Sequence, residues 1–234
     1  MYMNFENKLI SGELIKRYKR FFVDVKTSKG LVTAHCPNTG SMKGLLNKGN
    51  KVWLSESSNK KRKLKYTLQI IEVNGSKVGI NTHLTNKIFF DSLKKNYIKE
   101  FKKSVEIKPE VKFNEETRFD FLISKKNYKA FIEVKNVTLV RKKNIAEFPD
   151  AVTSRGAKHL KELLNAKRKG YDIFLVFVIQ REDCKKFTIA QDIDINYANL
   201  LKKALNNKLN LLCYDCKISS KGIKLNQRIK IKIK

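Results

Sequence analysis

The chain has 234 residues, 41% of them hydrophobic, which is enough to bury the core of one large domain or two modest ones. Its 51 Lys and Arg residues against 22 Asp and Glu give a net charge of +29, and this excess favours a polyanionic partner: DNA, RNA or an anionic membrane surface. No stretch reaches the roughly 18 apolar residues that span a bilayer, and the N-terminus lacks the apolar core of a secretory signal, so we expect a cytoplasmic protein without a membrane partner.

Residues 1–82 are expected to form one domain. About five short strands without a long helix are typical of a small barrel of the OB type. A hairpin is expected at Asn74-Gly75, and Ser41 could cap a short helical turn over residues 42–46. The expected strands are residues 21–25, 31–35, 51–55, 66–73 and 78–81.

Residues 83–234 alternate between strand and helix patterns, which predicts a layered α/β domain. The nearly continuous apolar run at 172–179 is typical of a central strand that is covered on both faces. The other expected strands are 105–112, 119–123, 130–134, 187–190 and 209–214, and the expected helices are 86–103, 153–169 and 196–207.

The four cysteines are expected to be free thiols, because disulfides are rare in cytoplasmic proteins. Cys213 and Cys216 have the spacing of half a zinc site. No second such pair accompanies them, and Cys213 directly follows two leucines. We therefore favour a buried strand position over a zinc ligand.

Two acidic residues and a lysine fall close together on the predicted hairpin. Glu133 and Lys135 are two positions apart on one strand, so their side chains share a face. If Ile123 pairs with Ala130, Asp120 lies directly opposite Glu133. Carboxylates this close repel each other unless a cation lies between them or one of them is protonated. A Mg²⁺ or Mn²⁺ ion would satisfy both and could activate water for phosphodiester cleavage, with Lys135 stabilising charge on the phosphate.

The same register predicts how the hairpin packs. Leu122 and Phe131 would share the face of the two acids. Because both faces are then largely apolar, the hairpin should be buried, with the charged cluster at its end. A salt bridge between Lys135 and one carboxylate is the simpler alternative to a metal site. The residues expected on the opposite face are Phe119, Phe121, Ile132 and Val134.

Other residues are candidates for the same site. Glu110, on the preceding strand, could supply a third carboxylate to the metal, although it follows a proline and could equally be solvated. On the predicted helix 153–169, Arg155, His159 and Glu162 lie near one polar face. Arg155 falls in the first turn, where backbone N–H groups favour anions. Phosphate contact is the functional interpretation of this face, and simple solvation is the alternative.

The N-terminal part contains further candidates for nucleic-acid contact. Basic and aromatic side chains alternate at 17–22, which suits a groove where cations meet phosphates and rings stack on bases, although at least one of the two Phe residues is expected in the core. The loop at 38–41 could bind an anion through its backbone N–H groups or form an ordinary turn. The candidates in these segments are Arg17, Tyr18, Lys19, Arg20, His35, Asn38, Thr39 and Ser41.

Taken together, these stretches resemble the sugar fermentation stimulation protein family (SfsA). The resemblance implies an OB-like N-terminal domain and a C-terminal domain similar to PD-(D/E)xK nucleases. In that motif the matching positions are Asp120, Glu133 and Lys135, with Phe119 where the motif has Pro, and Arg118 belongs to a matching stretch. The matching segments are residues 17–21, 35–42, 118–121, 133–139, 148–152, 155–156 and 158–160.

Three functional hypotheses follow. The resemblance implies a DNA-binding protein with a part in regulating sugar (maltose) metabolism, and nuclease activity by analogy of fold. The first hypothesis is a DNA-binding, Mg²⁺-dependent nuclease, and the second is a DNA-binding regulator that keeps the nuclease scaffold without cutting. The third is an RNA-binding or RNA-processing protein, because OB-like barrels also serve RNA. The oligomeric state stays open, a homodimer being one option.

Overall fold

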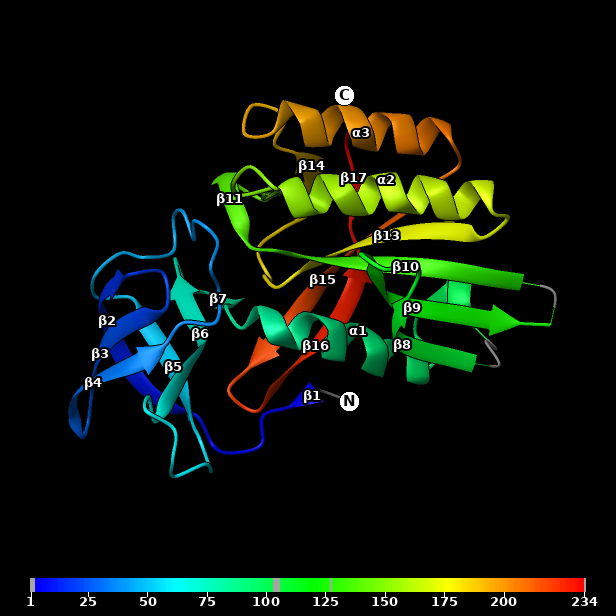
Figure 1. The fold of residues 1–234 in the computed structure, drawn as a ribbon. Coiled ribbons are helices and arrows are strands. Elements are labelled where there is room, and N and C mark those ends of the chain that lie inside the picture. The colour runs from blue at the N-terminus through cyan, green and yellow to red at the C-terminus, as the bar shows by residue number, and fades with distance from the viewer. Residues whose placement is uncertain (1–2, 103–105, 127, 234) are drawn as a thin grey trace.

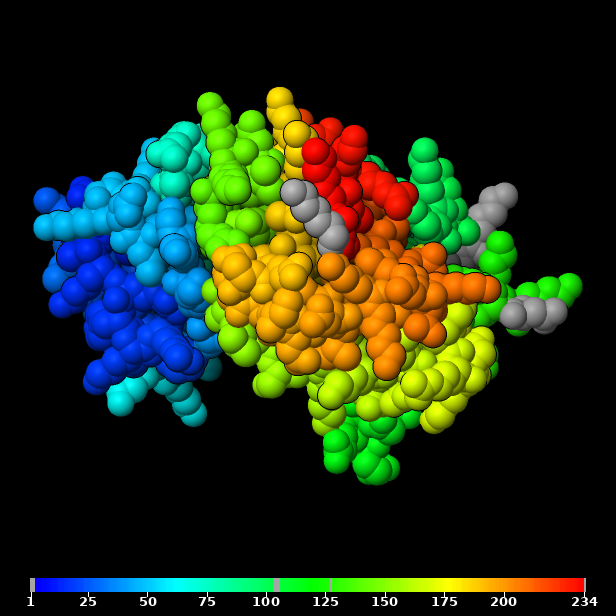
Figure 2. Space-filling model, turned by 90° about the horizontal axis from the view of Figure 1, so that it is seen from above, coloured from blue at the N-terminus to red at the C-terminus, as the bar shows by residue number. Residues whose placement is uncertain are grey.

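The computed structural model describes residues 3–102, 106–126 and 128–233. An N-terminal β-barrel lies beside a larger α/β domain, as the strands on the left of Figure 1 and the helix-covered sheet on the right show. Turned by 90°, the molecule has the barrel at one end and α3, in orange, on the face toward the viewer (Figure 2). The predicted fold class, an OB-like barrel followed by an α/β domain, is confirmed.

The barrel closes through a parallel pairing of its third and fifth strands. These are β4 and β6, whose partners are Ala34 with Tyr66 and His35 with Thr67. Closure removes the free edges of the sheet, and apolar side chains such as Leu14, Val25 and Leu68 fill the interior. The barrel strands are β2 (Ile10–Tyr18), β3 (Phe22–Thr27), β4 (Gly30–His35), β5 (Lys51–Glu56) and β6 (Tyr66–Val73), followed by β7 (Ser76–Gly79).

The second domain is built on a seven-stranded sheet of the described residues. Its centre is parallel, with β13 between β10 and β15, and every residue of β13 after Asp172 is buried. This confirms the predicted central strand. In spatial order the strands are β1 (Met3–Asn4), β16 (Gly222–Arg228), β15 (Asn210–Ser219), β13 (Asp172–Ile179), β10 (Tyr128–Val137), β9 (Arg118–Lys125) and β8 (Glu106–Lys112).

Helices cover both faces of this sheet (Figure 1). On one face α1 (Thr85–Lys94), after the 3₁₀ turn η1 (Thr82–Leu84), packs Ile88 and Phe89 against β9 and β10. On the other face lie α2 (Ser154–Arg168) and α3 (Ile195–Asn206). A small second sheet contains β11 (Leu139–Lys142), β12 (Ile145–Phe148), β14 (Lys186–Ile189) and β17 (Lys230–Ile231).

Several local predictions are confirmed. Asn74 and Gly75 both have positive φ, as the tight hairpin between β6 and β7 requires. The helix expected over 153–169 is α2, whose N-terminus Thr153 caps by accepting a hydrogen bond from the Gly156 N–H and whose C-terminus is followed by Gly170 at φ +88°. All four cysteines are free and buried, Cys213 and Cys216 lying on β15.

Other predictions differ from the structure in the boundaries or the number of the elements. The helix expected over 86–103 ends at Lys94, because Asn96 adopts a positive φ of 52°. A short 3₁₀ turn, η2 (Lys99–Phe101), follows. Residue 103 of this expected helix and residue 105 of the next expected strand lie outside the described residues. The short turn expected at 42–46 is a turn over 43–45, where the Leu45 N–H donates to the Met42 carbonyl at 3.1 Å and the Lys43 N–H donates to Ser41 Oγ at 3.4 Å. The strands β1, β2, β11, β12, β16 and β17 were not predicted.

None of the helices in the described part of the chain combines the length and apolar character needed to cross a membrane.

The two domains are joined by backbone and side-chain bonds. The Gly79 N–H donates to the Gln180 carbonyl at 2.9 Å, which connects the barrel to the end of β13. The Gln180 side chain is fully buried, and its amide donates to Asn136 Oδ1 at 2.7 Å and Thr85 Oγ1 at 3.1 Å. The close contact leaves no space at Gly79, where an added Cβ would lie 2.3 Å from Gln180 Oε1 and 3.1 Å from Ile223 Cδ1.

We expect Gly79→Ala to lower the free energy of unfolding by about 1–3 kcal/mol, because the methyl group overpacks a junction whose neighbours are buried. Urea unfolding followed by circular dichroism measures the change. Ser76→Ala, on the same strand, removes an atom instead of adding one and serves as the control. Equal midpoints for the two variants would contradict the prediction.

Candidate active site

A hollow of about 480 Å³ opens where the C-terminal part of β10 meets the start of α1. It contains each residue of the predicted metal and catalytic set, together with Arg155 of α2. Its lining residues are Thr82, His83, Thr85, Asn86, Lys87, Glu110, Asp120, Glu133, Val134, Lys135, Asn136 and Arg155.

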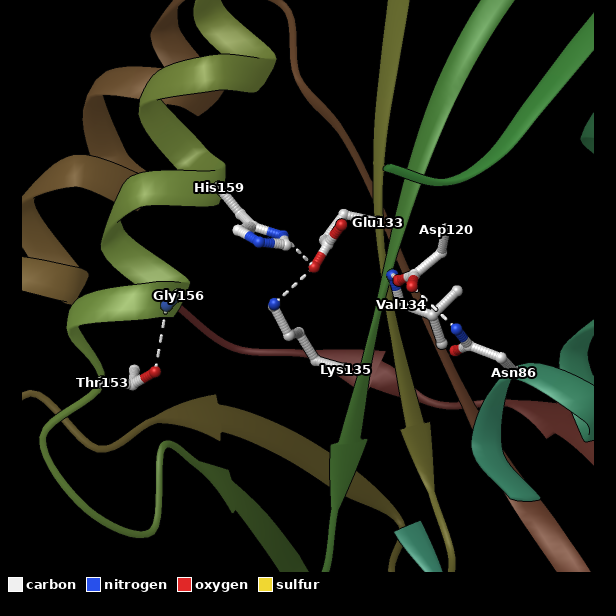
Figure 3. Close-up of polar contacts among 8 residues, drawn as sticks. All are labelled: Asn86, Asp120, Glu133, Val134, Lys135, Thr153, Gly156 and His159. Carbon is white, nitrogen blue, oxygen red and sulfur yellow. Dashed lines mark hydrogen bonds and ion pairs between the residues drawn. The ribbon is translucent and has the colours of Figure 1, made fainter. Parts of the chain in front are cut away.

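Glu133 is a buried carboxylate held by two partners. Its Oε1 accepts a hydrogen bond from Lys135 Nζ at 2.6 Å and also contacts Nδ1 of His159. Figure 3 shows Glu133 and Lys135 extending from β10 toward His159 on α2. Although burial opposes ionisation, Lys135 and His159 together lower the pKa of Glu133. The carboxylate is therefore charged at neutral pH, and its negative charge is compensated inside the protein.

Asp120 is held differently. Its Oδ2 accepts the Val134 N–H at 2.7 Å and its Oδ1 accepts the side-chain amide of Asn86 at 2.7 Å (Figure 3). Burial, followed by the charge of Glu133, raises the pKa of Asp120 to about 6 despite these two hydrogen bonds. The second contribution shows that the two carboxylates interact, as the sequence analysis expected.

The predicted register is correct, but the predicted faces are not. Ile123 pairs with Ala130, yet the ladder between β9 and β10 ends at Phe121 and Ile132, one pair before Asp120 and Glu133. The Val134 N–H then bonds to a side chain, because the strands separate. Asp120 approaches the hollow from the side of α1 and Glu133 from the side of α2 (Figure 3), so the two carboxylates share a hollow but not a face of the hairpin.

Phe119, next to Asp120, also packs on the face of the hairpin opposite to the predicted one. Its ring lies 4.9 Å from that of Phe131, whereas Phe121 packs against Phe89 of α1 on the other face. Phe119 was expected beside Phe121. The change of side coincides with Glu110 of β8, which lies between the pairs Pro109–Phe121 and Val111–Phe119 and has a positive φ of 52°. A β-strand alternates sides only while its backbone stays extended.

The hollow has the chemistry of a divalent-cation site. Glu133 Oε2 is buried and has no hydrogen-bond partner among the described residues, which is costly for a charged oxygen. Two mutually repelling carboxylates and an unpaired oxygen suit an oxygen-seeking ion such as Mg²⁺ or Ca²⁺. Glu110 is exposed on the hollow's rim, and no three His, Cys, Asp or Glu side chains of the described chain form a metal-holding group. The structure therefore does not bring Glu110 to the other two acids.

The polar face predicted for α2 is only partly exposed. Arg155 is exposed and lines the hollow. His159 is buried with 8% of its surface exposed, because it reaches inward to Glu133. Glu162 accepts a hydrogen bond from Asn114. His159 therefore positions Glu133, which corrects its expected place on an exposed, phosphate-contacting face.

The loop predicted to bind an anion does bind one from within the chain. Ser41 donates its backbone N–H at 3.0 Å and its hydroxyl at 3.4 Å to Asp150 Oδ2, from the segment between β12 and α2. Asn38 is buried, and its Oδ1 accepts the Gly40 N–H, while Thr39 is exposed beside them. Arg17 donates to the carbonyls of Asn38 and Gly40 and so holds the loop in place. Arg17, Asn38 and Ser41 therefore have structural partners.

The remaining candidates lie on the barrel surface and on β9. Lys19 and Arg20 form an exposed turn with positive φ, and Arg118 is exposed at the start of β9. Tyr18 stacks on Phe22 at 5.5 Å. Neither Phe of this segment belongs to the buried core, although one was expected to.

His35 combines a ring stack with a cationic setting. Its ring stacks on that of Phe21, which is 47% exposed, with centroids 6.5 Å apart. Burial, Arg62 and His83 lower the pKa of His35, so the ring is neutral at pH 7. It can therefore stack on or hydrogen-bond to a ligand without a charge of its own.

The sequence analysis missed Asn86, His83 and Lys87. Asn86 is the hydrogen-bond donor to Asp120, and the other two line the hollow at the start of α1. No motif marks them, because their place depends on how α1 packs across β9 and β10. His83 lies in the turn η1 before the helix, so no helical spacing along the sequence relates it to Lys87.

Comparisons with known proteins place the chain in a family. Residues 15–80 match the family described as the SfsA N-terminal OB domain, and residues 83–222 match the sugar fermentation stimulation protein RE domain. The sugar fermentation stimulation protein homolog of Pelagibacter ubique is 56% identical over 229 residues, which cover 98% of this chain and 99% of that protein. The homolog of Pseudoalteromonas atlantica is 44% identical, with 97% and 98% covered.

A solved structure agrees with the sequence matches. The structure of Pyrococcus furiosus SfsA in complex with Ca²⁺ superposes with a TM-score of 0.89 at 26% identity, and the match covers 100% of both chains. The identity and coverage of the relatives, with the two matched domains in order, show that the chain belongs to the sugar fermentation stimulation protein family.

Proposed function

We propose that this protein binds nucleic acid, DNA in the first place, and hydrolyses phosphodiester bonds with a divalent metal ion, Mg²⁺ or Mn²⁺. The observation that carries the proposal is the hollow in which Asp120 and Glu133 interact beside Lys135, with one buried Glu133 oxygen lacking a hydrogen-bond partner among the described residues. Nucleases of the PD-(D/E)xK type, which the sequence resembles, use two acids and a lysine in this chain order. The Ca²⁺ in the relative from Pyrococcus furiosus supports a divalent ion here.

The residues of the hollow would have different roles in the reaction. Asp120 and Glu133 would hold the metal, which when bound would polarise the phosphate and lower the pKa of a water molecule. Lys135, whose ammonium group is already in the hollow, would stabilise charge on the phosphate. In the net reaction water forms a bond to phosphorus, one P–O ester bond breaks, and a phosphomonoester and a hydroxyl result.

His159 and Asn86 position the two acids rather than touch substrate. His159 keeps Glu133 ionised and directed out of the apolar core, and Asn86 fixes one oxygen of Asp120. Arg155, exposed at the edge of the hollow, would contact the phosphate backbone. The net charge of +29 would bring polyanions to this surface.

We expect Glu133→Gln to abolish cleavage of DNA in Mg²⁺ or Mn²⁺ and Lys135→Ala to slow it roughly 10²- to 10³-fold, because each removes a charge from the reacting centre. A fluorescent-oligonucleotide cleavage assay measures the rates. The matched control is Glu115→Gln, a change at a residue whose side chain is 91% exposed.

Because Glu133 is buried, its replacement could also destabilise the fold, so circular dichroism accompanies each assay. We expect Asp120→Asn, which removes the other acid, to be inactive as well. Cleavage by Glu133→Gln at the wild-type rate would point to a contaminating enzyme and contradict the proposal.

Metal binding should depend on pH through Asp120. With a pKa of about 6, this carboxyl is mostly protonated at pH 5 and must lose its proton to bind a cation. Affinity for Mg²⁺ should therefore fall about tenfold for each pH unit below 6 and level off above it, whereas Glu133, with its lowered pKa, is already ionised there. Isothermal titration calorimetry at pH 5, 6, 7 and 8 tests this, with Asp120→Asn expected to remove the dependence. Equal affinity at pH 5 and pH 7 would refute it.

A second candidate function is a DNA-binding regulator of sugar (maltose) metabolism that does not cut. The observation in its favour is that Lys135 and His159 already compensate the charge of Glu133, as a structural salt bridge would. This function predicts DNA binding that weakens steeply with salt, no cleavage, and no loss of affinity in Glu133→Gln. Competition among single-stranded DNA, duplex DNA and RNA at fixed salt would also identify an RNA-binding protein.

A further inference from the structure

A second cleft begins where the first hollow ends. It has a volume of about 460 Å³ and lies between the OB-like barrel, the N-terminal segment and the start of α1. His83 and Lys87 line both this cleft and the hollow of Asp120 and Glu133, so the two cavities adjoin at these side chains. The cleft and the hollow are therefore neighbours at the domain junction.

Buried polar side chains form part of the cleft wall. Gln69 and Asn81 are only 5% and 9% exposed, yet both line the cleft. Asn81 Nδ2 donates to Gln69 Oε1 at 3.0 Å, and Gln69 Nε2 donates to Ser55 Oγ at 2.8 Å. These bonds fix the two amides, and each amide nitrogen has a second N–H. A wall of oriented donors and acceptors suits a ligand with polar edges, such as a nucleobase.

Cations and an aromatic ring lie along the same cleft. Arg62 and Lys87 are exposed in it, and neither forms a salt bridge with any acid among the described residues. Of the two acids that line the cleft, Glu56 is paired with Lys65 at 2.7 Å, which leaves Glu6. His35 contributes a ring that already stacks on Phe21. Such a combination of cations with aromatic and amide groups is how proteins hold unpaired nucleotides.

We propose that this cleft binds a single-stranded segment of the nucleic-acid substrate and leads it to Asp120 and Glu133. Arg62 and Lys87 contact its phosphates, and His35, Gln69 and Asn81 contact its bases. A cleft of about 460 Å³ has room for a ligand of drug size, such as one unpaired nucleotide, whereas a base pair brings two nucleotides with both of their backbones. The direction toward the acids rests on the proposed nuclease function, whereas the binding itself does not.

The test compares two double variants that remove the same charge. Arg62→Ala with Lys87→Ala changes the cleft, and Lys202→Ala with Lys203→Ala changes two exposed residues of α3, on the far side of the sheet from α1 and distant from the barrel (Figure 1). Binding of a fluorescein-labelled oligothymidylate is measured by anisotropy in EDTA, so that no cleavage occurs. We expect the cleft variant to bind at least tenfold more weakly than the wild type and the α3 variant to bind within about twofold of it.

A duplex of the same length should distinguish the two variants much less, because it cannot enter the cleft. Equal loss of oligothymidylate binding in both double variants would show that only net charge matters and would overturn the proposal. As a second measurement, an oligonucleotide with 5-iododeoxyuridine should cross-link to the cleft residues, His35 among them, in the wild-type protein. Cross-links confined to α2 and α3 would also overturn it.

These results separate the two proposals. If the nuclease function fails, no DNA is cut in Mg²⁺ or Mn²⁺, but selective binding by the cleft in EDTA still stands. If the cleft proposal fails, cleavage that depends on Glu133 still stands while the two double variants bind alike.

Discussion

The site depends on one buried charge, that of Glu133. Removing a carboxylate from water costs several kcal/mol unless partners compensate it. Here Lys135 from the same strand and His159 from α2 supply the compensation, and both contact the same oxygen. α2 packs Leu160 and Leu163 into the core on this face of the sheet, and this packing brings His159 to Glu133. The other oxygen stays without a partner in the described chain, which makes the place suitable for a cation.

The separation of β9 from β10 creates the space for that chemistry. A backbone N–H that leaves a sheet ladder must find another acceptor, and the Val134 N–H finds Asp120. The second acid is thereby fixed at the mouth of the hollow, beside the first, although the two side chains come from different sides of the sheet. Burial and the neighbouring charge then raise its pKa to about 6, so below that pH Asp120 takes up a proton first while Glu133 keeps its charge.

Polar contacts connect the two domains. The side-chain amide of Gln180 connects the end of the central sheet to the barrel, since it donates to Asn136, Thr85 and the Asn81 carbonyl. Ser41 of the barrel binds Asp150 of the second domain. These contacts place the barrel cleft and the acidic hollow next to each other. His83 and Lys87, which line both cavities, belong to the segment that joins the two domains.

The amino-acid sequence by itself determined the fold class, the central strand at 172–179 and the helix at 153–169, because these follow from local periodicity and capping. The pairing of Ile123 with Ala130 is a hypothesis from the same pattern, and the structure confirms it. The sequence also brought Asp120, Glu133 and Lys135 together as candidates. Only the tertiary structure decided that Phe119 changes sides, that His159 turns inward, that Glu110 stays on the rim and that Asn86 completes the site. Each of these depends on a backbone irregularity or on a helix packed across the sheet, and neither leaves a mark in the spacing of residues along the chain.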